Sequence, residues 1–139
     1  MREHMHIAPP PSWLDEQTRA LIQELIDGFS SHHPDVLAIV LYGSVARHQE
    51  RPLDRPDPSD VDLLLVLESD DPFVAVRRGA ALQQTLGEVE GRHLAAPREV
   101  QVQFASRTLA EWNPTFVAHV KRDGLILYQR GALPPVLAS

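Results

Sequence analysis

The sequence contains no cysteine, which excludes both a disulfide framework and a thiolate nucleophile. It also lacks a cluster of lysines and arginines, and its formal net charge at pH 7 is -6. Proteins that hold a long nucleic acid neutralise its phosphates with such clusters. We therefore expect a small ligand or a protein as partner, and no long nucleic acid.

Long hydrophobic runs are absent as well. The longest, residues 61–67, is far shorter than the roughly 20 residues that a membrane-spanning helix needs. The first residues lack the basic-then-apolar pattern of a secretory signal. We therefore expect a soluble, cytoplasmic protein without a membrane partner. A hydrophobic content of 43% over 139 residues is enough for the core of one domain.

The composition divides the chain into three predicted segments. Residues 1–11 show no periodicity and end in three prolines, which is typical of a flexible or extended leader. Residues 12–130 carry helical and strand patterns and are predicted to form the domain. Residues 131–139 are expected to form a loose C-terminal tail.

The spacing of apolar residues predicts alternating helices and strands within the domain. Strands are expected at residues 36–42, 60–68, 100–104 and 125–128. Helices are expected from Ser12 to a break at residues 32–35, over residues 45–49, from Asp70 or Asp71 to residues 87–91, from Ser106, and from Asn113 to Asp123. One side of the helix after Asp71 would carry Phe73, Val76, Ala80, Leu82, Leu86 and Val89. This order implies an α/β fold in which helices pack against a small mixed β-sheet.

Gly43 and Ser44 follow the first predicted strand and precede a short helix. A Gly-Ser turn at such a place lets the backbone approach an anion, and the helix N-terminus offers unpaired N–H groups. The Ser44 hydroxyl can then donate to a phosphate oxygen, and Arg47 can supply positive charge. Taken alone, however, a Gly-Ser dipeptide usually only turns the chain.

Asp60 and Asp62 alternate along the second predicted strand, and fifteen residues separate Ser44 from Asp60. Residues i and i+2 of a strand project from the same face, so the two carboxylates offer hard oxygen ligands that suit Mg²⁺. Like charges at this spacing are destabilising unless a cation lies between them. The alternative is that Asp60 caps the preceding loop and Asp62 lies at a frayed, solvated strand start.

Together, Gly43-Ser44 and residues 59–66, Ser-Asp-Val-Asp-Leu-Leu-Leu-Val, resemble the signature of the DNA polymerase β-like nucleotidyltransferase superfamily in its minimal nucleotidyltransferase form. The resemblance covers roughly residues 36–104. It implies the nucleotidyltransferase fold and transfer of a nucleoside monophosphate from a nucleoside triphosphate, expected to be ATP, to a hydroxyl of a protein or small molecule.

The same resemblance implies roles for the motif residues. Asp60 and Asp62 would be catalytic, binding two divalent metals, Mg²⁺ or Mn²⁺, together with the triphosphate, while Gly43 and Ser44 would hold its β and γ phosphates. Members of this size are often antitoxins that attach AMP to a tyrosine of a HEPN-type toxin. The resemblance therefore also suggests a HEPN-type toxin as a protein partner.

The sequence departs from the family at the third carboxylate, which lies on the next strand. The apolar-Asp-apolar-apolar pattern places Gln103 at this third-acid position, and a glutamine cannot act as a base. Gln101 shares the strand face and is also an amide, while Glu99 shares that face but lies four residues before Gln103, too far to substitute without a change of register. The alternative function is therefore a catalytically weakened or inactive nucleotide-binding or partner-binding module. An aminoglycoside-type enzyme is a weaker third interpretation, because those enzymes usually carry a second helical domain.

The loop between the two halves of the motif is longer than is typical of the minimal forms. It carries Arg51 and Arg55, which either reach phosphates or an acceptor or simply lie in a solvated loop. His48 occupies a position where the family frequently has glycine. Trp13 and Trp112 are expected to cover the core or an interface.

Overall fold

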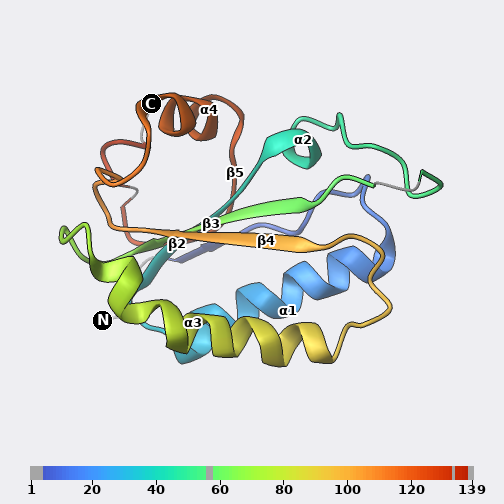
Figure 1. Cartoon of the computed structure of the whole chain (residues 1–139), viewed down its shortest axis with the longest axis horizontal. Helices are drawn as coiled ribbons and strands as arrows, with labels where there is room; N and C mark the ends of the chain where they lie inside the picture. The colour runs from blue at the N-terminus through green and yellow to red at the C-terminus, as the bar shows by residue number, and fades with distance from the viewer. Residues whose placement is uncertain (1–4, 56–57, 133, 138–139) are drawn as a thin grey trace.

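The computed structural model describes residues 5–55, 58–132 and 134–137. Its elements, in chain order, are β1 (Met5–Ile7), α1 (Glu16–His32), β2 (Val36–Tyr42), α2 (Gly43–Ala46), β3 (Val61–Leu67), α3 (Val74–Gly91), β4 (Val100–Ala105), α4 (Pro114–Asp123) and β5 (Leu125–Arg130). The strands form a five-stranded sheet in the order β1-β5-β2-β3-β4. Strands β3 and β4 are parallel and the other neighbours are antiparallel, so the predicted mixed α/β sheet is confirmed (Figure 1).

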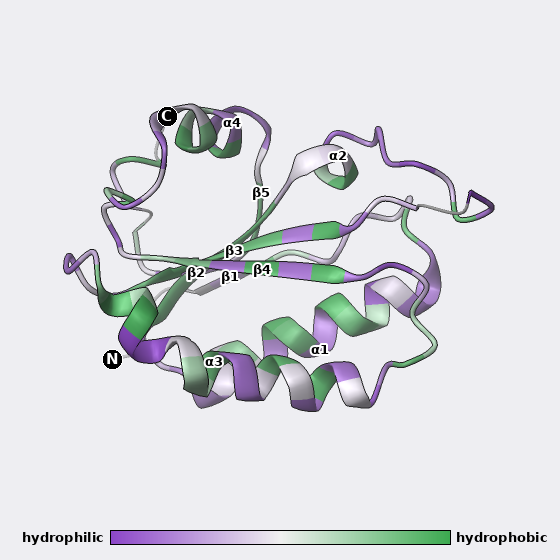
Figure 2. Cartoon of the chain, viewed as in Figure 1, coloured by the Kyte–Doolittle hydropathy of each residue, from purple (hydrophilic) through white to green (hydrophobic). Residues whose placement is uncertain are grey.

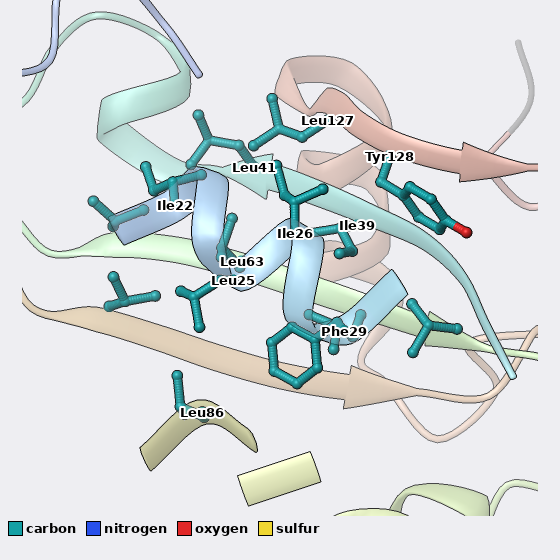
Figure 3. Close-up of a cluster of buried hydrophobic side chains, with 14 of the residues drawn as sticks. Ile22, Leu25, Ile26, Phe29, Ile39, Leu41, Leu63, Leu86, Leu127 and Tyr128 are labelled. Carbon is teal, nitrogen blue, oxygen red and sulfur yellow. The ribbon is translucent and has the colours of Figure 1, made fainter. Parts of the chain in front are cut away.

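Helices α1 and α3 cover one face of the sheet, and α2 and α4 lie on the other (Figure 1). The main core lies under α1, whose apolar residues recur at helical spacing and bury one stripe against the strands. Ile22, Leu25, Ile26 and Phe29 of α1 pack there with Ile39 and Leu41 of β2, Leu63 of β3 and Leu86 of α3 (Figure 3). The first predicted helix therefore forms and buries its apolar side against the sheet.

A second, smaller core lies on the opposite face. It joins alternate residues of β2 and β3 to the end of β4 and to α4, and comprises Ala38, Val40, Leu64, Val66, Ala105, Leu109, Val120 and Leu137. Strands β2 and β3 are therefore buried on both sides, in keeping with their continuous apolar runs. Hydrophilic bands interrupt β3 and β4 toward their N-terminal ends (Figure 2).

Both ends of the described chain contact the fold more than the sequence predicted. Strand β1 lies within the segment expected to be a leader, yet it pairs antiparallel with β5, and the Ala8 N–H donates to Leu127 O at 2.9 Å. Three residues are too short a stretch to show strand alternation. Leu137 lies within the segment expected to be a loose tail, yet it is buried in the smaller core.

Several helix boundaries differ from those predicted. Helix α1 begins at Glu16 because Asp15, and not Ser12, is the N-cap, and its carboxylate accepts from the Thr18 N–H at 2.9 Å. Helix α2 spans residues 43–46 instead of 45–49. No helix begins at Ser106, which is followed by a turn at residues 107–108, whereas α4 starts with the predicted Asn113 cap and Pro114.

The buried side of α3 was only partly predicted. Leu82, Leu86 and Val89 are buried as expected, but Phe73 and Val76 are 67% and 79% exposed, and Ala80 is exposed too. The six predicted residues fall on two different stripes of the helix, and only one of them can face the sheet. Among the described residues, no helix is long and apolar enough to cross a membrane.

Candidate functional site

The turn between β2 and α2 requires a glycine for two reasons. Gly43 has φ +81°, in the left-handed region that favours glycine. In addition, a Cβ at this position would collide with Oδ2 of Asp62. The backbone of the predicted phosphate-binding turn therefore packs directly against one of the two predicted metal-binding carboxylates.

Asp62 lies in β3 opposite Tyr42 of β2. Its side chain is half-buried, and this desolvation, followed by the nearby charge of Asp60, raises the pKa of Asp62 to about 6. Burial and a like charge both disfavour the ionised carboxylate. A cation bound between Asp60 and Asp62 would relieve both effects, so the local electrostatics fit a cation site.

The strand start that carries Asp60 is held firmly rather than frayed. Ser59 is 5% exposed, its carbonyl oxygen accepts from Arg98 Nη1 at 2.9 Å, and its hydroxyl oxygen accepts from the Arg51 N–H at 2.7 Å. Val61 N–H donates to Glu99 O at 2.8 Å. These contacts count against a frayed strand start as the explanation of the Asp60–Asp62 pair.

Arg98, only 6% exposed, is a site residue that the sequence did not reveal. A single arginine before an alternating strand carries no pattern that distinguishes it from a solvated residue. Its role becomes visible only when β4 pairs with β3 and brings Arg98 beneath the backbone of Ser59.

The register of β3 and β4 places the residues proposed for the third acid. Gln101 pairs with Asp62. Gln103 pairs with Leu64, two residues further along the same face of β3. Glu99 precedes β4 and is exposed. Across residues 5–55, 58–132 and 134–137, no group of three or more His, Asp or Glu side chains is placed to hold a metal ion. A cation at the described site would thus rely on Asp60 and Asp62, with amides on β4.

Arg47 is directed toward α4. Its Nη1 lies 3.6 Å from Asp123 Oδ2, at the end of α4, and its Nε donates to Gln49 Oε1 at 3.1 Å. Two of the three guanidinium nitrogens of Arg47 therefore already contact other side chains.

His48 and Trp13 form a stacked pair beside α2, with ring centroids 4.6 Å apart and an interplanar angle of 17°. His48 has φ +56°, a conformation that glycine adopts at lower cost. Trp13 Nε1–H donates to Val45 O, within α2, at 2.9 Å. The sequence predicted a covering role for Trp13 but gave no sign of this contact.

Three aromatic rings, those of Tyr42, Phe116 and Trp112, pack together against the smaller core, and Tyr42 is the strand partner of Asp62. Phe116 of α4 makes an edge contact with Tyr42 and stacks on Trp112, whose Nε1–H donates to Phe104 O at 3.1 Å. Burial, and then the charge of Asp62, raise the pKa of Tyr42 to about 12, so this phenol stays protonated at neutral pH.

The donor set of the site fits a hard divalent cation. Asp60 and Asp62 offer carboxylate oxygens from one strand face, and Asp62 carries a charge that its surroundings disfavour in the absence of a cation. The backbone of Gly43 closes one side of this pair. The arrangement can therefore bind a cation together with a phosphate-bearing ligand.

A family model described as "Nucleotidyltransferase domain" matches residues 22–116 of the chain. Among solved structures, a toxin-antitoxin with AMP-PNP is 18% identical, with a TM-score of 0.48, over 76% of this chain and 70% of that chain. The toxin-antitoxin MntA-HepT is 15% identical, with a TM-score of 0.45, over 78% and 70%. A protein of Sulfolobus solfataricus is 18% identical, with a TM-score of 0.46, over 79% and 80%. No curated protein matches the sequence.

Proposed function

Because the chain belongs to the nucleotidyltransferase domain family, we propose that it transfers a nucleoside monophosphate from a nucleoside triphosphate to a hydroxyl, with Mg²⁺ or Mn²⁺ and with ATP as the expected nucleotide. The observation that carries this proposal is the packing of the Gly43 turn against Asp62. It supports a single site in which the triphosphate and the cation meet.

In this proposal each residue has a distinct role. Asp60 and Asp62 hold the divalent ions, and Gly43 and Ser44 hold the β and γ phosphates through the backbone and a hydroxyl. The bound ions would supply Lewis-acid activation of the acceptor hydroxyl and neutralise charge on the departing pyrophosphate. Buried Arg98 fixes the backbone at Ser59 and so sets where Asp60 projects.

The second candidate function is a binding module with little or no transferase activity. The amides Gln101 and Gln103 on β4 favour it, because neither can take a proton from an acceptor hydroxyl. Binding of nucleotide needs only the turn and the two carboxylates, whereas fast transfer also needs a base. We therefore propose that nucleotide binding is better supported than rapid transfer.

The acceptor that we propose is a hydroxyl of a protein or small molecule, with a tyrosine of a HEPN-type toxin as the leading protein candidate. The support for this toxin is the likeness of the Gly43-Ser44 and Asp60-Asp62 motif to minimal nucleotidyltransferases. This acceptor is tested with the product of the neighbouring gene. Label that stays on free nucleotide in the presence of this product would contradict the toxin proposal but leave the nucleotide site intact.

One experiment separates the two candidate functions. The native chain and the variants Asp60→Ala and Asp62→Ala are incubated with Mg²⁺ or Mn²⁺, each labelled nucleoside triphosphate and the acceptor. Transfer that both substitutions abolish supports the enzyme, and transfer that survives both contradicts the metal-site assignment. A thermal shift with nucleotide but no transfer supports the binding module.

A further inference from the structure

Helix α2 has a single turn, Gly43–Ala46, and isolated helices this short are not stable by themselves. Its conformation must therefore come from the residues around it. This dependence matters because α2 begins with Gly43 and Ser44, which hold the phosphates in the proposed function. The inference that follows rests on that proposed function.

Three hydrogen bonds to Ser44 and Val45 hold the turn. Ser44 O accepts from the Gln49 N–H at 2.8 Å, and Val45 O accepts from the His48 N–H at 3.1 Å. Val45 O also accepts from Trp13 Nε1–H at 2.9 Å. Of these three bonds, only the one from Trp13 ties α2 to a distant part of the chain.

The Trp13 ring also steadies the residues that follow α2. It stacks on His48, whose positive φ is costly for a residue with a side chain. A parallel stack of two aromatic rings restricts the His48 side chain and offsets part of that cost. Trp13 thus contacts both the turn and the residue after it.

Trp13 can act as a support because its own backbone is anchored. The neighbouring Leu14 is buried in the main core, its N–H donates to Pro11 O at 3.2 Å, and its carbonyl accepts from Arg19 Nε at 3.0 Å. The indole therefore projects from a fixed turn ahead of α1. It links this turn to α2, whose Val45 and Ala46 are buried in the same core as Leu14.

We propose that Trp13 is a positioning residue of the nucleotide site. Its indole N–H and ring hold α2 so that the Gly43 backbone and the Ser44 hydroxyl face the triphosphate. Trp13 does not touch the nucleotide. The segment that precedes α1 is thereby a working part of the site, although it lies outside the matched residues 22–116.

The test uses Trp13→Phe, which keeps an aromatic ring but removes the N–H donor. Trp112→Phe is the matched control, because it removes the same donor from Phe104 O on β4. Calorimetry measures the binding of Mg·ATP and of Mg·tripolyphosphate, which has no base or sugar. Trp13→Phe should weaken both ligands by about 2- to 10-fold, the loss expected for one hydrogen bond. Trp112→Phe should leave the binding of tripolyphosphate within about 2-fold.

A second measurement does not depend on any nucleotide. Amide hydrogen exchange at residues 43–47 should be faster in Trp13→Phe than in the native chain or in Trp112→Phe. Ser44→Ala should also cost less triphosphate affinity in the Trp13→Phe background than in the native chain, because both changes act on one turn.

Two results would overturn the proposal. The first is unchanged exchange at residues 43–47 in Trp13→Phe. The second is weaker binding of ATP with unchanged binding of tripolyphosphate, which would mean that Trp13 contacts the base. A native chain that binds neither ligand would instead overturn the proposed function. Faster exchange in Trp13→Phe would then still show that Trp13 holds α2.

Discussion

On the face of the sheet under α1 and α3, strand residues such as Ile39, Leu41 and Leu63 are apolar and fully buried (Figure 3). On the opposite face, the apolar pair Val40 and Leu64 is followed toward α2 by the pair Tyr42 and Asp62. Within two residues along the same face of β3, the chain thus passes from Leu64 in the smaller core to Asp62, a carboxylate with a raised pKa. Packing on the first face stabilises the fold, whereas part of the second face carries polar residues of the candidate site in place of buried apolar ones.

The largest expected loss of stability comes from a substitution in the main core, on the first face. Phe29 is fully buried in the main core, so Phe29→Ala should lower the free energy of unfolding by about 3–5 kcal/mol through lost burial and a cavity. Urea denaturation measures this loss. Phe116→Leu, a change to a half-buried ring on the second face, is the control and should cost much less. Equal losses of unfolding free energy in the two variants would contradict the proposal that the first face supplies most of the stability.

The next prediction separates stability from function on the second face. Asp62→Asn removes a carboxylate that burial and Asp60 both disfavour, so the free energy of unfolding should stay the same or rise. Nucleotidyl transfer should nevertheless fall by at least about 100-fold, because metal-held charge is worth several kcal/mol.

Asp70→Asn is the control for Asp62→Asn, since it alters a carboxylate that follows the opposite end of β3 and pairs with Arg107. Its effect on transfer should be small. A loss of stability in Asp62→Asn without a loss of transfer would show that Asp62 is structural.

Gly43 and Gly124 are the glycines of the described chain at which a Cβ would collide with another atom, and of these two only Gly43 has a positive φ. Gly43→Ala forces a side chain into a left-handed conformation and against Asp62, and should cost about 1–3 kcal/mol of unfolding free energy. The cost should shrink in an Asp62→Gly background. Gly87→Ala is the control: this site in the interior of α3 has open space, and alanine there should stabilise by about 0.5–1 kcal/mol. Thermal unfolding of Gly43→Ala, Asp62→Gly, the double variant and Gly87→Ala measures these changes in stability.

The first face has a polar contact of its own, which predicts a dependence on pH. His33 Nδ1 lies 2.9 Å from Arg78 Nη2 and His33 Nε2 lies 2.7 Å from Thr85 Oγ1, while Arg78 also pairs with Asp35. Burial, and then the charge of Arg78, lower the pKa of His33. The unfolded chain therefore binds more protons than the native one as pH falls below about 6.5.

This stabilisation is fully present above that pH and is lost as pH falls toward the lowered pKa of His33. Arg78 lowers the pKa of Asp35 as well, so acid weakens both members of this contact. His33→Gln should flatten the fall in unfolding free energy between pH 6.5 and 5, whereas His119→Gln, on the exposed side of α4, should not. The same slope in both variants would mean that His33 is not the group responsible.

The two faces also differ in how far the sequence predicted them. Helical spacing in α1 and the apolar run of β2 predicted the main core, because each pattern depends on residues close together in the chain. The two halves of the motif could also be predicted, because the Gly43-Ser44 turn and the Asp60-Asp62 pair are each recognisable from neighbouring residues in the sequence. Arg98 and the Trp13 contact were not visible, because strand pairing and a turn bring together residues that no local pattern connects. The pairing of Gln101 with Asp62 could not be predicted for the same reason, because the register of two parallel strands depends on both strands.

That register leads to the smallest expected effect, a gain of activity. If a carboxylate level with Asp62 is what transfer needs, Gln101→Asp should raise the rate a few-fold, because the surrounding residues are not arranged to support a new base. Gln103→Asp places its charge beside apolar Leu64, so it should lower stability and raise the rate less. Transfer rates and unfolding free energies of both variants, measured at the same pH and Mg²⁺ concentration, distinguish the two positions. A larger gain in Gln103→Asp would mean that the acceptor hydroxyl lies deeper over the sheet than Asp62, and the boundary between core and site on this face would move by one pair of residues.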